Sequence, residues 1–149
     1  MLHACKSVLP IDIAICAAAV TDWRSDKCYS KKIKKDHKKN SVLKLIENPD
    51  ILACLSKHEE MRPELVVGFA AETENILNNA SEKILKKGCD WILANDVSAS
   101  SGTFGGDRNT VCLISNKGTD RWPTLTKTAV ARRLCKSIVQ HLKSQKSAA

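Results

Sequence analysis

The sequence predicts an α/β fold in which helices cover both faces of a parallel sheet. The first observation is three apolar runs of strand length, at residues 11–20, 65–71 and 90–94, because buried parallel strands are apolar throughout. The second is a helical pattern between successive runs, since strands that alternate with helices form parallel sheets. The third is size: 149 residues, of which 43% are hydrophobic, predict a single domain, 1–149, with one core.

The first half of the chain combines the first strand with a long loop and a short helix. Residues 21–40 form the polar loop, and the apolar positions within 41–46 predict a short strand. Residues 48–50, Asn-Pro-Asp, then begin a helix that ends near His58. Asparagine caps helices, proline suits the first helical position, and an acid stabilises the positive end of the helix.

The second half continues the alternation of strands and helices. A helix over 73–87 carries apolar side chains on one face and stops at Gly88, a residue type that suits a helix C-terminus. A Ser/Gly-rich loop at 98–107 follows the third strand. The remaining expected elements are a fourth strand at 110–115, a turn at 116–119, a helix at 126–142 and a frayed tail at 144–149.

The charge of the chain indicates an anionic partner. Its net charge is +8, which suits a nucleotide, a nucleic acid, a phosphorylated metabolite or an acidic lipid. Three tryptophans, one tyrosine and two phenylalanines are too few and too scattered for the stacking platforms of single-strand binders. No apolar run approaches the ~20 residues of a membrane span, and the N-terminus lacks a signal-peptide pattern, so no membrane partner is expected.

The seven cysteines predict a cytoplasmic protein with reduced thiols. Their number is odd, and no pair has Cys-x-x-Cys spacing. This usage fits a reducing compartment better than a disulfide framework or a zinc site. His3 and Cys5 form the only close His/Cys pair, and they lie at a terminus that is expected to fray.

The stretch that begins at Asp22 is the most informative part of the chain. Asp22 follows the first apolar run, and residues 27–39 carry seven lysines. Ligands bind outside the carboxyl ends of parallel strands, and lysine suits phosphate oxygens, so an anionic-ligand site is one interpretation; a solvated lysine-rich loop is the other. A Walker loop, a dinucleotide-binding glycine turn and a nucleophile–base constellation are all missing from the sequence. That leaves electrostatic catalysis rather than a protein nucleophile.

Four segments occur in the order and spacing of one known enzyme family. They are AAAVTDWR with the following KKIKK, then ENPDIL, then VVGFAAET, and then WILANDVS with the later Phe104, Asp107 and Asn109. Over about residues 10–145 the chain resembles the phosphopantothenoylcysteine synthetase domain of the bacterial bifunctional coenzyme A biosynthesis flavoprotein. The resemblance implies a Rossmann-like three-layer fold that is incomplete at its N-terminal side, because the chain matches the C-terminal two-thirds of that domain.

The chain departs from the family pattern in two ways. Trp23 stands where the family usually has tyrosine, and Ser30-Lys31 stands where it has Pro-Glu; both changes are tolerable. The first half of the family domain, with a Gly-rich phosphate-binding segment and an asparagine that handles the acyl-cytidylate, has no counterpart here. Nor has the flavin-binding domain, so no flavin is expected in this chain. Loss of that half would expose a strand edge and an apolar surface, and the chain alone is expected to be inactive or nearly so.

The resemblance implies a CTP-dependent ligase reaction. The carboxylate of 4′-phosphopantothenate would attack the α-phosphate of CTP, which gives an acyl-cytidylate and pyrophosphate. The amine of L-cysteine would then displace CMP and form the amide, with Mg²⁺ assisting. Both steps develop negative charge on oxygens, so cations and amide donors do the catalytic work.

The family's functional residues carry over onto matching positions. Lys32 matches the catalytic loop lysine, and Asp22 matches the acid that contacts the nucleotide or Mg²⁺; no residue is assigned as a metal ligand. Lys83 and Lys87, on one helix face, match a nucleotide-contacting pair, although such lysines are usually a solvated face. The other implied nucleotide-binding residues are Ala18 and Ala19 at a close-packed strand end, Pro49, Asp50, Ile51 and Leu52 at a helix N-terminus, and Phe69, whose alternative role is core packing.

Partners follow from the same resemblance, and two alternatives stay open. The family's domains pair as homodimers with the lysine loop near the interface, so a homodimer, or pairing with the missing N-terminal half, is expected. A basic nucleic-acid or polyanion-binding module is the second hypothesis, built on residues 27–39 and the basic last helix (Lys127, Arg132, Arg133 and Lys136). A non-catalytic dimerisation fragment is the third. Asn95 and Asp96 would position Mg²⁺ or cap a turn.

Overall fold

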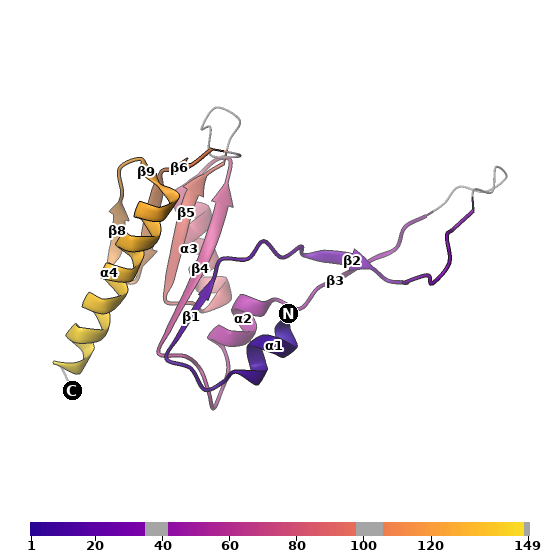
Figure 1. Cartoon of the computed structure of the whole chain (residues 1–149), viewed down its shortest axis with the longest axis horizontal. Coiled ribbons are helices and arrows are strands. Elements are labelled where there is room, and N and C mark those ends of the chain that lie inside the picture. The colour runs from indigo at the N-terminus through magenta and orange to yellow at the C-terminus, as the bar shows by residue number, and fades with distance from the viewer. Residues whose placement is uncertain (35–41, 98–105, 148–149) are drawn as a thin grey trace.

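The centre of the molecule is a five-stranded sheet, seen in the computed structural model that describes residues 1–34, 42–97 and 106–147 (Figure 1). The strands stand in the order β1-β4-β5-β7-β8. Their bounds are Ile13–Cys16 for β1, Leu65–Glu72 for β4, Trp91–Asp96 for β5, Val111–Ser115 for β7 and Gly118–Arg121 for β8.

The sheet is parallel over three strands and ends in an antiparallel hairpin. Strands β1, β4 and β5 pair in parallel, as the sequence pattern predicts. Strand β7 runs antiparallel to β5, and β8 runs antiparallel to β7. The turn at residues 116–117 is too short for a crossover, so β8 has to reverse direction. The α/β fold is confirmed, and the hairpin is an addition that the sequence analysis did not include.

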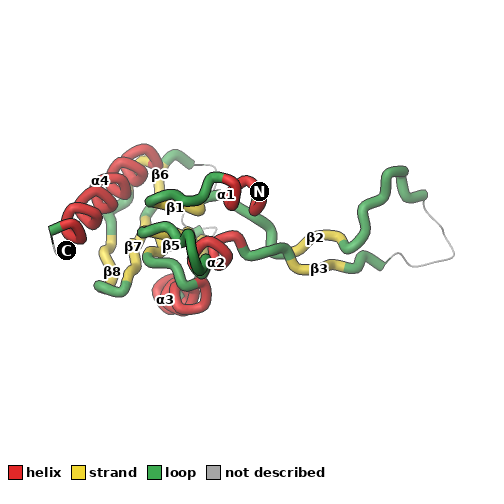
Figure 2. Tube along the Cα trace, turned by 90° about the horizontal axis from the view of Figure 1, so that it is seen from below, coloured by secondary structure: helices red, strands yellow, loops and turns green. Residues whose placement is uncertain are grey.

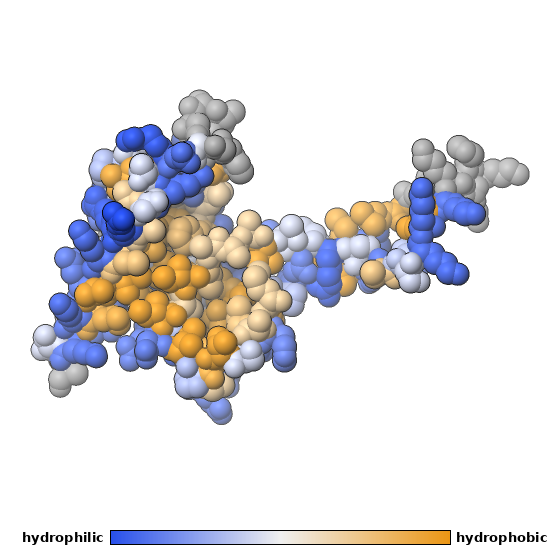
Figure 3. All heavy atoms as spheres, in the orientation of Figure 1, coloured by the Kyte–Doolittle hydropathy of each residue, from blue (hydrophilic) through white to orange (hydrophobic). Residues whose placement is uncertain are grey.

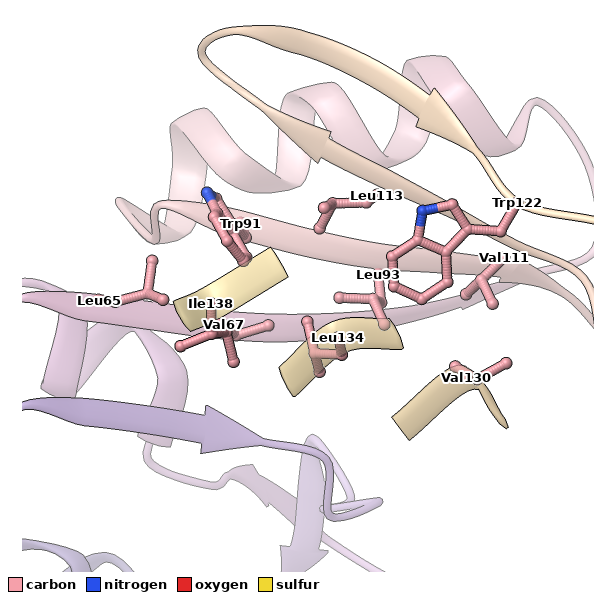
Figure 4. Packing of buried hydrophobic residues seen from close by; sticks show 10 residues of the cluster. All are labelled: Leu65, Val67, Trp91, Leu93, Val111, Leu113, Trp122, Val130, Leu134 and Ile138. Atoms are coloured by element: carbon pink, nitrogen blue, oxygen red, sulfur yellow. The ribbon is translucent and has the colours of Figure 1, made fainter. Parts of the chain in front are cut away.

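Helices cover both faces of the sheet and make it the middle of three layers (Figure 2). Helix α4 (Lys127–Lys146) packs on one face, where its buried side chains meet Val67 and Leu93 (Figure 4). Helices α2 (Ile51–Ser56) and α3 (Ile76–Lys87) pack on the other face. Successive side chains along a strand point to opposite faces of the sheet, so each face has its own hydrophobic core. Among the described helices, none is both long enough and apolar enough to cross a bilayer.

A two-stranded arm projects from the sheet at the carboxyl end of β1 (Figures 1 and 2). It consists of β2 (Trp23–Ser25) and β3 (Leu45–Glu47), which pair antiparallel. Its base is held by Asn48, whose backbone N–H donates to the Asp22 carbonyl (2.7 Å) and whose side-chain amide donates to the Thr21 carbonyl (2.8 Å). Residues 35–41, which come between β2 and β3 in the sequence, lie outside the described residues.

Arg62 joins the amino ends of two strands to the ends of two helices. Its guanidinium donates to both oxygens of Asp90, at 2.9 and 3.0 Å, and to the carbonyls of Ser56 (2.7 Å) and Gly88 (3.3 Å). Asp90 also accepts the backbone N–H of Val66 at 2.7 Å. The end of α2, the C-cap of α3 and the starts of β4 and β5 therefore meet at one side chain.

Several predicted boundaries are corrected by the structure. The strand expected at 11–20 is only β1, since its pairing with β4 ends at Cys16 opposite Gly68. The terminus expected to fray forms helix α1 (Leu2–Ser7). Helix α3 starts three residues late because Asn75 takes a left-handed conformation (φ 47°). The last helix continues to Lys146, and two short strands, β6 (Arg108–Asn109) and β9 (Leu125–Thr126), pair before it.

A glycine on β4 lets α2 pack close to the sheet. A Cβ at Gly68 would lie 2.6 Å from Cδ2 of Leu52, a residue of α2. We expect Gly68→Ala to lower the free energy of unfolding by about 1–2 kcal/mol, because Leu52 has to leave its preferred rotamer. Urea denaturation measures the loss. In a Leu52→Ala background the same substitution should cost almost nothing, and an undiminished cost there would contradict the clash.

Candidate functional site

A cavity of about 720 Å³ lies at the carboxyl end of β1. Its walls are helix α1 and the residues after it, β1, the base of the arm, the residues around the start of α2, Phe69 of β4 and the last turns of α3. Both Ile15 and Cys16 line it, and they lie on opposite faces of β1. The cavity therefore wraps around the edge of β1 that pairs with no other described strand. This is the end of an α/β sheet at which ligands bind.

Most of the residues that the sequence analysis assigned to the site line this one cavity. They are far apart in the sequence, from Ala18 after β1 to Lys87 at the end of α3. Neither Ala19 nor Lys32 lines it. The assigned residues that do are Ala18, Asp22, Pro49, Asp50, Ile51, Leu52, Phe69, Lys83 and Lys87.

Two lysines of α3 that line the cavity form ion pairs with carboxylates of other elements. Lys87 forms an ion pair with Asp50, which precedes α2, and Lys83 pairs with Glu72 at the end of β4 at 3.5 Å. Lys86, which the sequence analysis missed, also lines the cavity and acts electrostatically on Asp50. Three cations within two turns of a helix form the site's positive wall, and each of the two paired lysines can exchange its carboxylate for a phosphate oxygen.

Asp50 is both the cap of α2 and the partner of Lys87. Its Oδ1 accepts the backbone N–H of Ala53 at 3.0 Å, and its Oδ2 accepts from Lys87. Partial burial opposes its ionisation, but the bonds from Ala53 and Lys87, with the field of Lys86, hold the pKa of Asp50 below its ordinary value. Asp50 is therefore ionised at neutral pH, and its negative charge faces the ammonium group of Lys87.

The start of α2 differs from the prediction. Asp50 is the N-cap, not Asn48, because the amide of Asn48 bonds the base of the arm. Asp50 occupies the N–H of Ala53, and α2 has only six residues. Its N-terminus therefore has one donor fewer for a ligand and a carboxylate already in place, which makes it a weaker anion site than the sequence analysis expected.

The end of β1 is also more open than predicted. Ala18 and Ala19 are exposed rather than close-packed, because the strand ends at Cys16 and the chain then leaves the sheet. Phe69 packs against the α4-side core and also lines the cavity, so its core role is seen and its contact with a nucleotide stays a prediction.

Lys32 follows β2 in the sequence, is exposed, and does not line the cavity of its own chain. The arm of β2 and β3 extends away from the sheet (Figure 1). The structure therefore does not bring Lys32 and Lys87 together within one copy. The exposed apolar side chains of the arm include Tyr29 (61%), Ile33 (67%) and Leu43 (70%). Phe104 and most of the loop 98–107 lie outside the described residues.

The fit of a metal ion can be judged from the acids present. Among residues 1–34, 42–97 and 106–147, no three His, Cys, Asp or Glu side chains cluster as ligands. Asp22 and Glu47 line the cavity, while Asn95 and Asp96 do not. Mg²⁺ bound to a nucleotide needs only one or two carboxylates besides the phosphates and water, so Asp22 and Glu47 fit that mode of binding.

The low pKa of Asp50 predicts a pH effect on stability. A carboxyl whose pKa is lower in the folded state stabilises that state at pH values above the pKa of the unfolded chain. This contribution is lost as the pH falls through the folded value. Asp50→Asn should therefore lose less stability than the parent between neutral and acid pH, as urea midpoints will show. Asp12→Asn, at an exposed position outside the cavity, is the matched control and should follow the parent curve.

Sequence comparison finds relatives that are much longer than this chain. Residues 1–142 match the family described as the DNA/pantothenate metabolism flavoprotein C-terminal domain. The coenzyme A biosynthesis bifunctional protein CoaBC of Escherichia coli K12 is 38% identical over 135 residues, which is 89% of this chain and 33% of that protein. CoaBC of Borreliella burgdorferi is 34% identical over 135 residues, 90% of this chain and 33% of that protein. The chain spans about a third of the length of these relatives.

Solved structures agree with this match. The crystal structure of the C-terminal domain of CoaBC superposes with a TM-score of 0.72 at 30% identity and covers 96% of this chain and 61% of that chain. The DNA/pantothenate metabolism flavoprotein of Streptococcus pneumoniae superposes with a TM-score of 0.67 at 19% identity, which shows the shared fold alone.

Proposed function

The chain belongs to the family of the DNA/pantothenate metabolism flavoprotein C-terminal domain, and on that basis we propose that it acts in coenzyme A biosynthesis as part of a phosphopantothenate–cysteine ligase. The supporting observation is the cavity at the end of β1, where the α3 lysines and the assigned nucleotide-binding residues meet. CTP, 4′-phosphopantothenate and L-cysteine are its proposed ligands. The seven free cysteines fit a cytoplasmic location.

The proposed reaction needs charge stabilisation, and the cavity offers it. Attack by the 4′-phosphopantothenate carboxylate on the α-phosphate of CTP releases pyrophosphate, and attack by the cysteine amine releases CMP. Negative charge grows on phosphate oxygens in both steps. Lys83, Lys86 and Lys87 can bind these oxygens, and the pairing of Lys87 with Asp50 holds its ammonium group at the wall beforehand. Such preorganised cations stabilise a transition state without reorganising during the reaction.

Mg²⁺ would neutralise phosphate charge when it is bound. Asp22 and Glu47 are the cavity carboxylates that would hold it, together with the phosphates. Phe69, from the adjacent strand β4, offers an apolar surface to the nucleotide, and the carboxylate of Asp50 keeps Lys87 in place until phosphate arrives.

Lys32 enters this proposal through a homodimer. Lys32 does not line the cavity of its own chain, so a second copy would have to supply it. The exposed apolar side chains of the arm are suited to packing against another copy, because exposed apolar surface of this kind favours association. We therefore propose that the arm is the dimer contact and that it delivers Lys32 to the partner's cavity.

Isothermal titration with CTP, and with ATP as the control, tests the nucleotide site. In Mg²⁺ and moderate salt we expect selective binding of CTP, weakened about tenfold or more in Lys87→Gln and in Lys32→Gln. Lys117→Gln, at an exposed turn between β7 and β8, is the matched charge control and should bind as the parent does.

The other outcomes separate the competing functions. Equal affinity for CTP and ATP would contradict the CTP preference. Binding of duplex DNA that falls steeply with salt, without any nucleotide selectivity, would favour the polyanion-binding alternative. A folded sample that binds neither nucleotide would show that this chain alone does not form the site.

A further inference from the structure

Asn48 forms the joint between the arm and the wall of the cavity. The arm extends from the rest of the molecule and joins it at its base (Figures 1 and 3). Asn48 lies at that base, directly after β3, and Pro49 and Asp50 follow it. Because Asp50 caps α2 and pairs with Lys87, three consecutive residues connect the arm to the positive wall of the cavity.

Two hydrogen bonds from Asn48 fix the backbone on both sides of Asp22. The backbone N–H of Asn48 donates to the Asp22 carbonyl at 2.7 Å, and its side-chain amide donates to the Thr21 carbonyl at 2.8 Å. These carbonyls belong to the two peptide planes that flank the Cα of Asp22, and only two soft dihedral angles lie between such planes. With both planes held, the direction of the Asp22 side chain is set. Asp22 lies between β1 and β2 and belongs to neither, so strand pairing does not fix it.

Arg24 sets the orientation of the Asn48 amide. Its Nη1 donates to Oδ1 of Asn48 and to the Glu47 carbonyl, each at 2.9 Å. Because the oxygen of the amide faces Arg24, its NH₂ group faces Thr21. Pro49 adds a second restraint, since a residue before proline is restricted to extended backbone conformations. The side chain and the backbone of Asn48 are therefore both held before a ligand binds.

We propose that Asn48 is a positioning residue, which acts through Asp22 and holds that carboxylate toward the ligand in the cavity. Both residues line the cavity. The inference rests on the proposed nucleotide-binding function, in which Asp22 and the α3 lysines serve the same bound nucleotide. An acid and a cation that share a ligand have to keep a set separation, because a displacement of about 1 Å can cost about 100-fold in rate. The joint at Asn48 sets that separation.

Neither helix capping nor core packing accounts for Asn48. Asp50 is the cap of α2, and the side chain of Asn48 is only half-buried. The residue also lies outside both hydrophobic cores. Asn48→Ala should therefore leave the urea midpoint of the chain close to that of the parent, which separates a local effect on the cavity from a loss of the fold.

Amide hydrogen exchange of the full chain without nucleotide tests the joint itself. In Asn48→Ala we expect about tenfold faster exchange at two amides of the arm. They are the amide of residue 48, which donates to Asp22, and that of Asp26, which donates across the arm at 2.9 Å. The amide of Asp90, which donates to a carbonyl of β4 at 3.0 Å, should keep its rate.

A matched substitution controls for the loss of an asparagine side chain. Asn78 is exposed on α3 and does not line the cavity at β1. Asn78→Ala should leave the exchange rates of the arm amides and the affinity for CTP unchanged.

Isothermal titration with CTP in Mg²⁺ tests whether Asn48 acts through Asp22. Asn48→Ala and Asp22→Asn should each weaken binding about tenfold, and the double variant should bind about as weakly as either single variant, because both changes remove the same contact. Asn48→Ala combined with Lys87→Gln should instead be additive, at about 100-fold, since Lys87 contacts the ligand from the other wall. A residue that only maintained the fold would not distinguish these two partners.

Two results would overturn the inference. One is unchanged exchange at residue 48 and at Asp26 in a folded Asn48→Ala variant. The other is full additivity of Asn48→Ala with Asp22→Asn. If the parent chain binds no CTP, the nucleotide proposal fails for this chain, while the exchange rates still decide whether Asn48 holds Asp22.

Discussion

Ile92→Ala is expected to lower the free energy of unfolding by about 4 kcal/mol. Ile92 is fully buried on β5, in the middle of the sheet. It stands between Gly68 on β4 and Ile114 on β7. Because Gly68 has no side chain to move into the space, the lost atoms leave a cavity that the sheet cannot close, and that term adds to the lost burial. Domains of this size have a total stability of about 5–15 kcal/mol, so the variant will be close to unfolding.

Urea denaturation followed by circular dichroism measures this loss. Ile92→Val removes one methyl group and should cost about 1 kcal/mol. Leu85→Ala removes an apolar side chain that is 83% exposed and should change little. A cost below about 1 kcal/mol for Ile92→Ala would show that the core around β5 relaxes, which contradicts the close packing described above.

Arg62→Met is expected to cost about 2–3 kcal/mol. Methionine keeps much of the apolar stem but removes the donors that bind Asp90 and the carbonyls of Ser56 and Gly88. The ion pair is about one-third exposed on each side, so the Coulomb attraction by itself is modest. The larger part of the cost comes from partly buried acceptors that lose their partner.

A double-mutant cycle tests this explanation. Asp90→Asn alone should also destabilise, and Arg62→Met combined with it should cost clearly less than the sum of the two single changes, because both remove the same contacts. Arg132→Met, at an exposed position on α4, is the matched control and should be close to neutral. Strict additivity would mean that Arg62 and Asp90 act separately.

The sequence pattern identified the elements that build the sheet but missed their lengths. The apolar run at 11–20 predicted one long strand, and only Ile13–Cys16 pairs, because strand length depends on where the neighbouring strand ends. The helix predicted from residue 73 begins at Ile76, since the left-handed Asn75 interrupts it and local periodicity does not reveal such a turn.

The candidate site also has a part that the sequence predicted and a part that only the fold shows. Asp22, residues 49–52, Phe69, Lys83 and Lys87 were assigned from the family resemblance, and the fold collects them in one cavity. The pairing of Lys87 with Asp50 spans 37 positions, and no local pattern encodes a contact at that separation. Lys86 was missed for the same reason, because a lysine on a charged helix differs from its neighbours only in what the fold sets opposite it.

The sequence by itself determined the α/β class, the family and the end of the sheet that holds the candidate site, because strand and helix periodicities and short motifs are local properties of the chain. Only the tertiary structure decided that Lys32 does not line the cavity of its own chain, that Asp50 rather than Asn48 caps α2, and that β1 is an edge strand among the described strands. These features depend on which side chains and strands meet in space. Packing over long sequence separations sets those meetings, and local propensity leaves them open.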